Sequence, residues 1–440
     1  MKRTTRRGAL ATIAAGALGA QQAQEEEFQV YGDSPRLFLN ARRLRLLKRE
    51  RERTSVRWTQ LETLVAGKAQ MAEQGLAHAL YHIVSGSAEF GKSAVQFALQ
   101  TNDMRQQAIV LDWCQAVLSE EQLKLLSTRL RQGLGAAPAK RDMGTMRDRA
   151  LAAVAIGHKE ELERIVKEWW RKEVAPGLRA GSYRYTREDS YALFEMLHAI
   201  RDGIQIDLRD DAPRYFKELP FYHVLSYYPA TFPAAENEYR VPFYDGDGEP
   251  DLRVAALARA ADLAMVAFDT NAQETQFVQG WLIHDRFLMR GVFGIVYEFL
   301  WANPYQPGLS YYHLPLSMHH AASGRLALRS SWEDDAVWFH YSDRKVQFFE
   351  EGRRKDRGLN SPAPVEIGGT VVHFGRDTMK FQPANAELQK TYIIGLAPNA
   401  RYDIEVDDEE IVEKMTDAGG ILEFDFPPMQ DKSVRVKRVP

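Results

Sequence analysis

The sequence contains a single cysteine, Cys114, so the chain cannot form an internal disulfide. Cys114 lies in the apolar run AIVLDWCQAVL, where a buried residue is expected rather than a nucleophile, because nothing near it would stabilise a thiolate. An excess of charge is lacking too, since 57 Lys and Arg against 60 Asp and Glu give a formal net charge of −3. This balance predicts no nucleic acid partner, which normally needs a basic surface, but it permits local basic grooves.

The chain also lacks an apolar run of about 20 residues, the length that a membrane-spanning helix needs. At the N-terminus, MKRTTRRGALATIAAGALGAQQAQ combines a basic start, a short apolar run and small residues that suit cleavage. The adjacent arginines in TTRRGAL match a twin-arginine export signal. We therefore expect an export signal over residues 1–24, a periplasmic or secreted protein, and no membrane span.

With 440 residues, 45% of them hydrophobic, the chain can bury a large core in two or three domains. No fixed-period repeat indicates a regular solenoid. From Pro35 to about Asn303, apolar residues recur at helical spacing, which favours a toroid or bundle of helical hairpins. The predicted helices are 37–61, 75–84, 87–99, 105–117, 119–133, 145–156, 160–174, 186–200, 252–268 and 277–301.

The stretch from Arg209 to Asp251 breaks the helical pattern, because it is rich in proline and aromatic residues. A long loop of this kind is usually a lid or the lining of a binding site. Its aromatic rings suit stacking against sugars, or they pin the loop to the core, and the sequence leaves both open. The acidic segment DGDGEPD within it has Pro250 where a calcium loop needs glycine, so no metal is expected.

After Pro304 the pattern changes to the period of two that is typical of strands, with runs such as RLALRSSW, AVWFHYS and KVQFFEEG separated by turn residues. About eight such runs predict an antiparallel β-sandwich. The predicted fold class is therefore α+β multidomain, with a helical domain over residues 25–305 and a β-sandwich domain over residues 306–440.

A series of segments in the same order resembles the heparinase II/III-like and alginate-lyase-like polysaccharide lyase superfamily, of which the chain looks like a divergent member. The segments are SPRLFLNARRLRLLKRERE, GLAHALYHIVSGSAEFGKSAVQFAL, VLDWCQAVLSEEQLKLL, YTREDSYALFEML and SGRLALRSSWEDDAVWFHY. The resemblance implies an incomplete (α/α) toroid followed by an antiparallel β-sandwich. It also implies β-elimination on an acidic polysaccharide or oligosaccharide, without a cofactor.

Such an elimination needs a group that neutralises the uronate carboxylate, a base, and an acid for the leaving oxygen. Tyr191 is the candidate for proton transfer, and helical spacing brings it to the same face as Arg187, which would lower the phenol pKa. A packed tyrosine with a satisfied hydroxyl is the alternative. Arg147 or Arg141 is the candidate carboxylate clamp, unless both belong to a solvated helix end, and Glu188 is a further substrate-binding candidate.

In the β domain, His340 is the candidate catalytic histidine, with His373 as a second, although a lone strand histidine is more often structural. Tyr244 is a candidate for substrate binding. The adjacent pair His319 and His320 would point to opposite faces of a strand, which disfavours joint metal binding.

Two functions therefore remain open. One is an exported lyase that acts on uronic acid glycans through Tyr191, an arginine clamp and His340. The other is a catalytically inactive glycan-binding or scaffolding relative of the same fold. The sequence indicates neither the glycan nor the oligomeric state.

Overall fold

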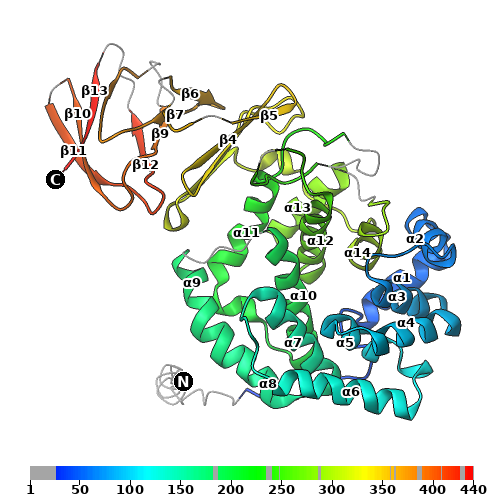
Figure 1. Cartoon of the computed structure of the whole chain (residues 1–440). Coiled ribbons are helices and arrows are strands. Elements are labelled where there is room, and N and C mark those ends of the chain that lie inside the picture. The colour runs from blue at the N-terminus through cyan, green and yellow to red at the C-terminus, as the bar shows by residue number, and fades with distance from the viewer. Residues whose placement is uncertain are drawn as a thin grey trace, which may run out of the picture.

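The protein has an α+β multidomain fold in which all long helices precede the strands, and this confirms the predicted fold class (Figure 1). The computed structural model describes residues 26–181, 187–233, 240–246, 248–285, 289–356, 358–360, 363–383, 389–407, 409–426 and 432–439. The export signal predicted over residues 1–24 lies outside these ranges. Within them, no helix combines the length and the apolar character needed to cross a membrane.

The helical part alternates inner and outer helices. The α-helices are α1 (Ala41–Glu52), α2 (Val56–Ala66), α3 (Gln74–Ser85), α4 (Ala88–Gln100), α5 (Met104–Trp113), α6 (Glu120–Gly135), α7 (Met143–Ile156), α8 (Lys159–Arg164), α9 (Ala175–Ala180), α10 (Arg187–Ile204), α11 (Pro213–Leu225), α12 (Leu252–Phe268), α13 (Gln273–His284) and α14 (Gly294–Trp301). A π-helical segment, η2 (Ile165–Val174), joins α8 to α9, and short 3₁₀ helices are η1 (Gln115–Val117), η3 (Leu208–Asp211), η4 (Tyr311–His313) and η5 (Ala321–Ser323).

Helices α3, α5, α7, α10, α12 and α14 pack against one another in that order, and α14 also packs against α3. They therefore form a ring of helical hairpins, in which the intervening helices return on the outside (Figure 1). Because each inner helix follows an outer one, the inner helices share one direction. Their N-termini consequently gather at one end of the ring and their C-termini at the other.

Local sequence sets several helix ends. Ser119 and Gln122 form a capping box at the start of α6. The predicted helix over 37–61 is instead two helices, because Thr54 adopts a left-handed conformation with φ of 49° and Ser55 caps α2. The predicted loop over 209–251 contains α11, which continues through Pro220.

Two of the segments that carried the family resemblance contact each other. The Asp112 carboxylate accepts hydrogen bonds from the Ser34 hydroxyl and from the backbone N–H groups of Arg36 and Leu37, at 2.7 to 2.8 Å. The Trp113 indole N–H donates to the Leu37 carbonyl oxygen at 2.9 Å. These residues therefore anchor the entry segment to α5, which is a structural role.

The strands are β1 (Ser317–His320), β2 (Arg325–Arg329), β3 (Trp338–Ser342), β4 (Lys345–Glu350), β5 (Arg353–Asp356), β6 (Val365–Ile367), β7 (Thr370–Phe374), β8 (Thr378–Phe381), β9 (Gln389–Ile394), β10 (Arg401–Val406), β11 (Glu409–Met415), β12 (Leu422–Phe426) and β13 (Val434–Arg438). They form three sheets of order β1-β2-β3-β4-β5, β11-β10-β13-β8 and β12-β9-β7-β6. Neighbouring strands in these sheets are antiparallel except β7 and β9, which are parallel.

The sheets join the ring through α11, which packs against β1 and β2, and through the aromatic segment that follows it. Tyr228 is buried, stacks on Phe349 at 5.0 Å and meets Trp338 edge to face at 5.0 Å. These rings therefore pin the segment to the first sheet, one of the two roles that the sequence left open. The predicted boundary at residue 305 lies between α14 and η4, and the domain division stays a prediction.

Candidate functional site

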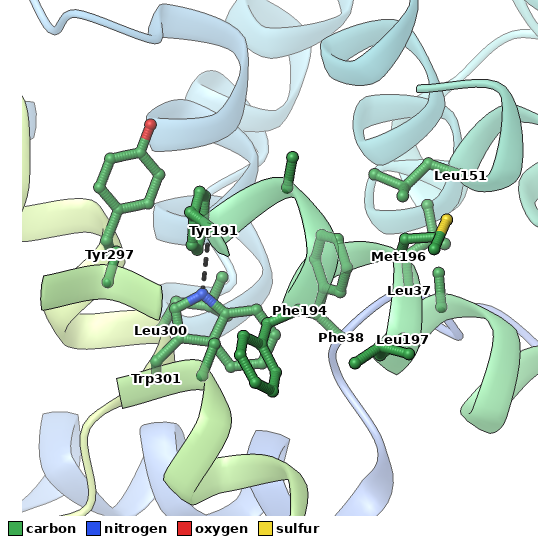
Figure 2. Packing of buried hydrophobic residues seen from close by; sticks show 14 of the residues in the cluster. Leu37, Phe38, Leu151, Tyr191, Phe194, Met196, Leu197, Tyr297, Leu300 and Trp301 are labelled. Carbon is green, nitrogen blue, oxygen red and sulfur yellow. Dashed lines mark hydrogen bonds between the residues drawn. The ribbon is translucent and has the colours of Figure 1, made fainter. Parts of the chain in front are cut away.

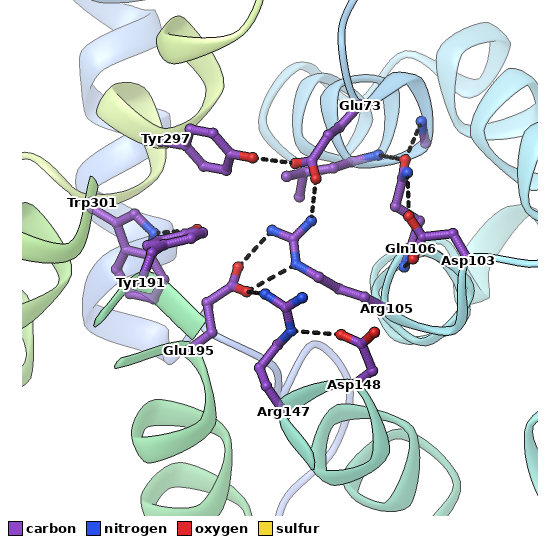
Figure 3. A network of polar contacts seen from close by, with 12 residues as sticks. Glu73, Asp103, Arg105, Gln106, Arg147, Asp148, Tyr191, Glu195, Tyr297 and Trp301 are labelled. Carbon is purple, nitrogen blue, oxygen red and sulfur yellow. Dashed lines mark hydrogen bonds and ion pairs between the residues drawn. The ribbon is translucent and has the colours of Figure 1, made fainter. Parts of the chain in front are cut away.

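A polar network occupies the interior of the ring and is built by residues of the inner helices (Figure 3). We call it the inner network and define it as Glu73, Arg105, Arg147, Asp148, Tyr191, Glu195, Tyr297 and Trp301. Glu73 is the N-cap residue of α3, and the others come from α5, α7, α10 and α14. It contains Tyr191 and Arg147, the two predicted catalytic residues of the helical part.

The network centres on the fully buried carboxylate of Glu195. Arg105 donates to both of its oxygens, at 2.9 and 2.6 Å, and Arg147 donates to one of them at 2.6 Å. Burial alone would raise the pKa of Glu195, but the charges of Arg105 and Arg147 outweigh it and lower that pKa. Glu195 is therefore an ionised anchor for two guanidinium groups, with no lone pair directed at a ligand.

The remaining hydrogen bonds of the inner network pair its arginines with further carboxylates. Arg105 also donates to Glu73 at 2.6 Å, and the Tyr297 hydroxyl donates to the other Glu73 oxygen at 2.7 Å. Arg147 donates its Nε–H to Asp148 at 2.5 Å. Each arginine of the network thus meets two carboxylates, so Arg147 is already neutralised where a substrate clamp would need a free charge.

Tyr191 is 2% exposed and its hydroxyl accepts a hydrogen bond from the Trp301 indole N–H at 3.0 Å (Figure 2). Burial, followed by the charge of Glu195, raises the pKa of Tyr191 well above its ordinary value. The pKa of Tyr191 is raised and not lowered, because burial and Glu195 outweigh the lowering by Arg105. The side chain of Arg187, the arginine expected to lower this pKa, lies outside the described residues. The hydroxyl matches the alternative of a packed and satisfied tyrosine.

The other helical candidates lie elsewhere. Arg141 forms an exposed ion pair with Glu173 outside the inner network. Arg187 and Glu188 lie in the first turn of α10, but their side chains are outside the described part of the structure. Their substrate-binding roles stay predictions.

The β-domain candidates form a separate group. His340 is buried, stacks on Phe243 at 4.1 Å and lies parallel to Trp338 at 5.7 Å. No contact among the described residues joins His340 to Tyr191 or Arg147. Tyr244 donates to the Gly248 carbonyl oxygen at 2.7 Å, and its own carbonyl accepts from Gln347.

Two further predictions concern single side chains. His373 packs against Phe381, and burial lowers its pKa to about 4, so it is neutral over the physiological range. Burial raises the pKa of Cys114 to about 12, which agrees with an inert thiol.

A second candidate site, which the sequence predictions missed, lies toward the C-terminal ends of the inner helices. It is a cleft of about 710 Å³ between α1 and the ends of α10, α12 and α14. We call it the arginine cleft, after the six arginines in its wall: Arg42, Arg43, Arg45, Arg49, Arg53 and Arg201. No carboxylate is among its lining residues in the described structure.

Three of these arginines are held in place by the cleft wall. Arg43 donates to the carbonyl oxygens of Leu300 and Trp301 and lies over the Trp301 ring at 5.0 Å. Arg201 lies over Phe268 at 3.7 Å, and Arg53 lies over Tyr305 at 5.9 Å. These cation–π contacts hold the three side chains in place. Arg201 is also paired with Asp202 at 2.9 Å, so its charge is compensated.

The other three arginines, Arg42, Arg45 and Arg49, are exposed. Within the described ranges their guanidinium groups form no hydrogen bond or ion pair with the protein. Their spacing at i, i+3 and i+7 places them on one face of α1, spread over about 10 Å. This spacing in ARRLRLLKRERE was the signal available in the sequence, but without the fold it indicates only a solvated basic helix.

Trp301 separates the two sites. Its indole N–H bonds to Tyr191 in the inner network, while the face of its ring carries Arg43 of the arginine cleft. The buried indole therefore closes the inner network on the side of the cleft.

Comparisons with known proteins add little. No protein-family model matches the sequence, and no curated protein matches it. Among solved structures, one described as a glycoside hydrolase is similar over 83% of this chain and 71% of its own, with 10% identity and a TM-score of 0.32. A GH127 β-arabinofuranosidase is similar over 94% of this chain and 80% of its own, with 8% identity and a TM-score of 0.29. Similarity this low carries no argument about function.

Proposed function

We propose that the protein binds an acidic polysaccharide or oligosaccharide in the arginine cleft, and that it does not cleave this ligand by β-elimination through Tyr191. The observation that carries the proposal is a large cleft in which Arg42, Arg45 and Arg49 have no counter-charge among the residues that the structure describes. Guanidinium groups recognise carboxylate and sulfate groups well, because their paired N–H donors match two oxygens.

The aromatic rings of the cleft argue against a nucleic acid ligand. Proteins that bind single strands stack successive bases on exposed aromatic faces. Trp301 and Phe268 are buried beneath guanidinium groups, which leaves Tyr305 as the exposed ring among the described lining residues. The cleft thus offers charge without a series of stacking faces, and this suits an anionic sugar chain.

The proposal is tested by binding measurements with the full-length mature chain. Calorimetry would compare heparin, hyaluronan, alginate and polygalacturonate with neutral dextran and with a single-stranded DNA of matched charge. We expect at least one acidic glycan to bind, dextran not to bind, and added salt to weaken binding. Equal or tighter binding of the DNA would contradict the proposal.

The site is tested by the combined substitution of Arg42, Arg45 and Arg49 with alanine. If each lost contact is worth about 1 kcal/mol, affinity falls by more than ten-fold, since 1.4 kcal/mol corresponds to a factor of ten. The matched control replaces Lys92, Lys124 and Arg131, which are exposed cations outside the cleft, and removes the same total charge. An equal loss in the control would show that the cleft is not the binding site.

Lyase activity is tested by following the ultraviolet absorbance of unsaturated products on the same glycans. We expect none, because the Tyr191 hydroxyl is buried and its pKa is raised. A product that disappears in Tyr191→Phe would instead establish the lyase function.

We also propose that the protein is exported, in accordance with the signal predicted over residues 1–24. Replacement of Arg6 and Arg7 by lysine should then hold the chain in the cytoplasm, as measured by cell fractionation.

A further inference from the structure

A small pocket lies where the ring meets the first sheet, between α11 and the strands β1 and β2. Its volume is about 60 Å³. By the same measure a single water needs about 10–15 Å³, so the pocket holds roughly four or five non-hydrogen atoms and not a sugar ring. We call it the junction pocket and define it by Glu218, Leu219, Tyr222, Met318, His320 and Arg325.

Arg325 is the charged group of the junction pocket, at the start of β2. Its Nε atom is buried and has no hydrogen-bond partner in the described structure. One terminal nitrogen lies 3.4 Å from the Tyr222 hydroxyl, which is a long contact, and the guanidinium lies over the Tyr222 ring at 5.7 Å. No carboxylate of the described residues lies within ion-pair distance of Arg325, so its paired donors remain available for an oxyanion.

His320 supplies a second donor. Its Nδ1 atom accepts from the Ser323 backbone N–H at 3.3 Å and lies 2.7 Å from the Ser323 hydroxyl. The neutral ring therefore carries its proton on Nε2. That atom is 4.0 Å from the Glu218 carboxylate, which is too far for a hydrogen bond.

The position of His320 is fixed from the side of α9. At Gly181, which follows α9 with a φ of +70°, an added Cβ would lie 2.5 Å from the imidazole Cε1 atom. Only glycine leaves this space open, and it also suits the left-handed backbone conformation. The imidazole is thus held between Gly181 and Ser323.

The charges around His320 favour an anion. Glu218 is the acidic group of the pocket, and it already accepts a hydrogen bond from Arg214 at 2.8 Å. The other charged or titratable groups that act on His320 are Arg325, Arg214 and His319. Leu219 and Met318 supply apolar surface for the carbon atoms of a ligand.

We propose that the junction pocket binds one carboxylate group, held by paired bonds from Arg325 and by single bonds from the Tyr222 hydroxyl and His320 Nε2–H. The ligand is a small organic acid or the carboxylate of a uronic acid residue that lies across the junction. This site is separate from the arginine cleft and does not depend on it.

Calorimetry on the mature chain tests the proposal with acetate, glucuronate and glucose. Acetate and glucuronate should bind and glucose should not. Tighter binding of glucuronate than of acetate would identify a uronic acid as the ligand, and equal binding would identify a small acid. Binding should strengthen from neutral to mildly acidic pH, because the anion favours a protonated His320.

Two variants locate the site. Arg325→Met should reduce the affinity for the carboxylate by ten-fold or more, and Tyr222→Phe should reduce it a few-fold while it keeps the packing. Arg353→Met, an exposed arginine of the same sheet, is the matched control and should bind as the wild type does. The variant without Arg42, Arg45 and Arg49 should also retain carboxylate binding, which separates this site from the cleft.

The proposal is overturned if neither carboxylate binds the wild type, or if both Arg325→Met and Tyr222→Phe bind as the wild type does. Either result would leave polysaccharide binding in the arginine cleft untouched.

Discussion

The inner network and the arginine cleft use arginine in opposite ways, although Trp301 alone separates them at their closest point of contact. In the network, Arg105 and Arg147 are each paired with two carboxylates. In the cleft, Arg42, Arg45 and Arg49 lie side by side on one face of α1 and line the open space. Buried, paired arginines hold helices together, whereas exposed arginines without partners are available to a ligand.

The pKa values of Arg105 in the network and Arg43 in the cleft differ in the same way. Burial would lower the pKa of Arg105, but Glu195 and Glu73 outweigh it and raise that pKa. Burial lowers the pKa of Arg43 to about 10, where Asp202 opposes the shift and Arg201 and Arg57 add to it. The positive charge is thus stabilised at Arg105 by its carboxylate partners and disfavoured at Arg43 by burial.

The largest expected effect is on stability, from Glu195→Gln. Removing this charge leaves Arg105 and Arg147 without their shared buried partner, which typically costs about 3–5 kcal/mol. Urea denaturation measures the change in the free energy of unfolding. Glu121→Gln, at an exposed position of α6, is the control and should change stability by about 0.5 kcal/mol or less. Similar values for the two variants would refute the structural role of the network.

A smaller effect is expected at Trp301, where the two sites touch. Trp301→Phe removes the donor to Tyr191 and part of the ring beneath Arg43, so stability should fall by roughly 1–2 kcal/mol. A double-mutant cycle with Tyr191→Phe should give a coupling energy of about 1 kcal/mol. Zero coupling would mean that the indole bond does not tie the hydroxyl in place.

The sheets contain a third arrangement, a histidine between two carboxylates. Burial would lower the pKa of His319, but hydrogen bonds with Asp417 and Glu423 outweigh it and raise that pKa. The protonated ring therefore contributes stability that is fully present below the unfolded pKa of about 6.5 and is lost as pH rises through the folded value. Urea denaturation across this range should show the loss, and His319→Gln should remove it. If stability depends on pH in the same way in the wild type and in His319→Gln, groups other than His319 cause the loss.

The smallest effect is expected from the combined Arg42, Arg45 and Arg49 substitution in the absence of ligand. Because these side chains are exposed and unpaired, the free energy of unfolding should stay within about 0.5 kcal/mol of the wild type, or rise slightly as repulsion is relieved. A loss of several kcal/mol in the free energy of unfolding would mean that these arginines stabilise the fold, as Arg105 and Arg147 do.

Much of the fold followed from local sequence. The bounds of α12, 252–268, match the prediction, because apolar periodicity and helix caps act within a few residues. The errors arose where tertiary packing overrides local preference. Helix α11 continues through Pro220, which sequence rules treat as a breaker, because it is packed between α13 and the first sheet.

The candidate sites show the same division between what local sequence predicts and what tertiary packing decides. Tyr191 and Glu195 lie on one face of α10, as their i, i+4 spacing requires, but the partners of that face come from α5, α7 and α14. No spacing rule relates residues so far apart. The pKa of Tyr191 is raised because its hydroxyl is buried beside Glu195, and the sequence does not reveal this burial.

The sequence by itself determined the order of helices and strands, the ends of several helices and the absence of an internal disulfide. Only the tertiary structure decided what each arginine does. Arg42 lies in the highly charged α1 and Arg105 in the largely apolar α5, but neither local sequence names the partner of its arginine. The ring brings Glu195 and Glu73 to Arg105 and leaves Arg42 beside an open cleft, because the meeting of charges depends on which helices become neighbours.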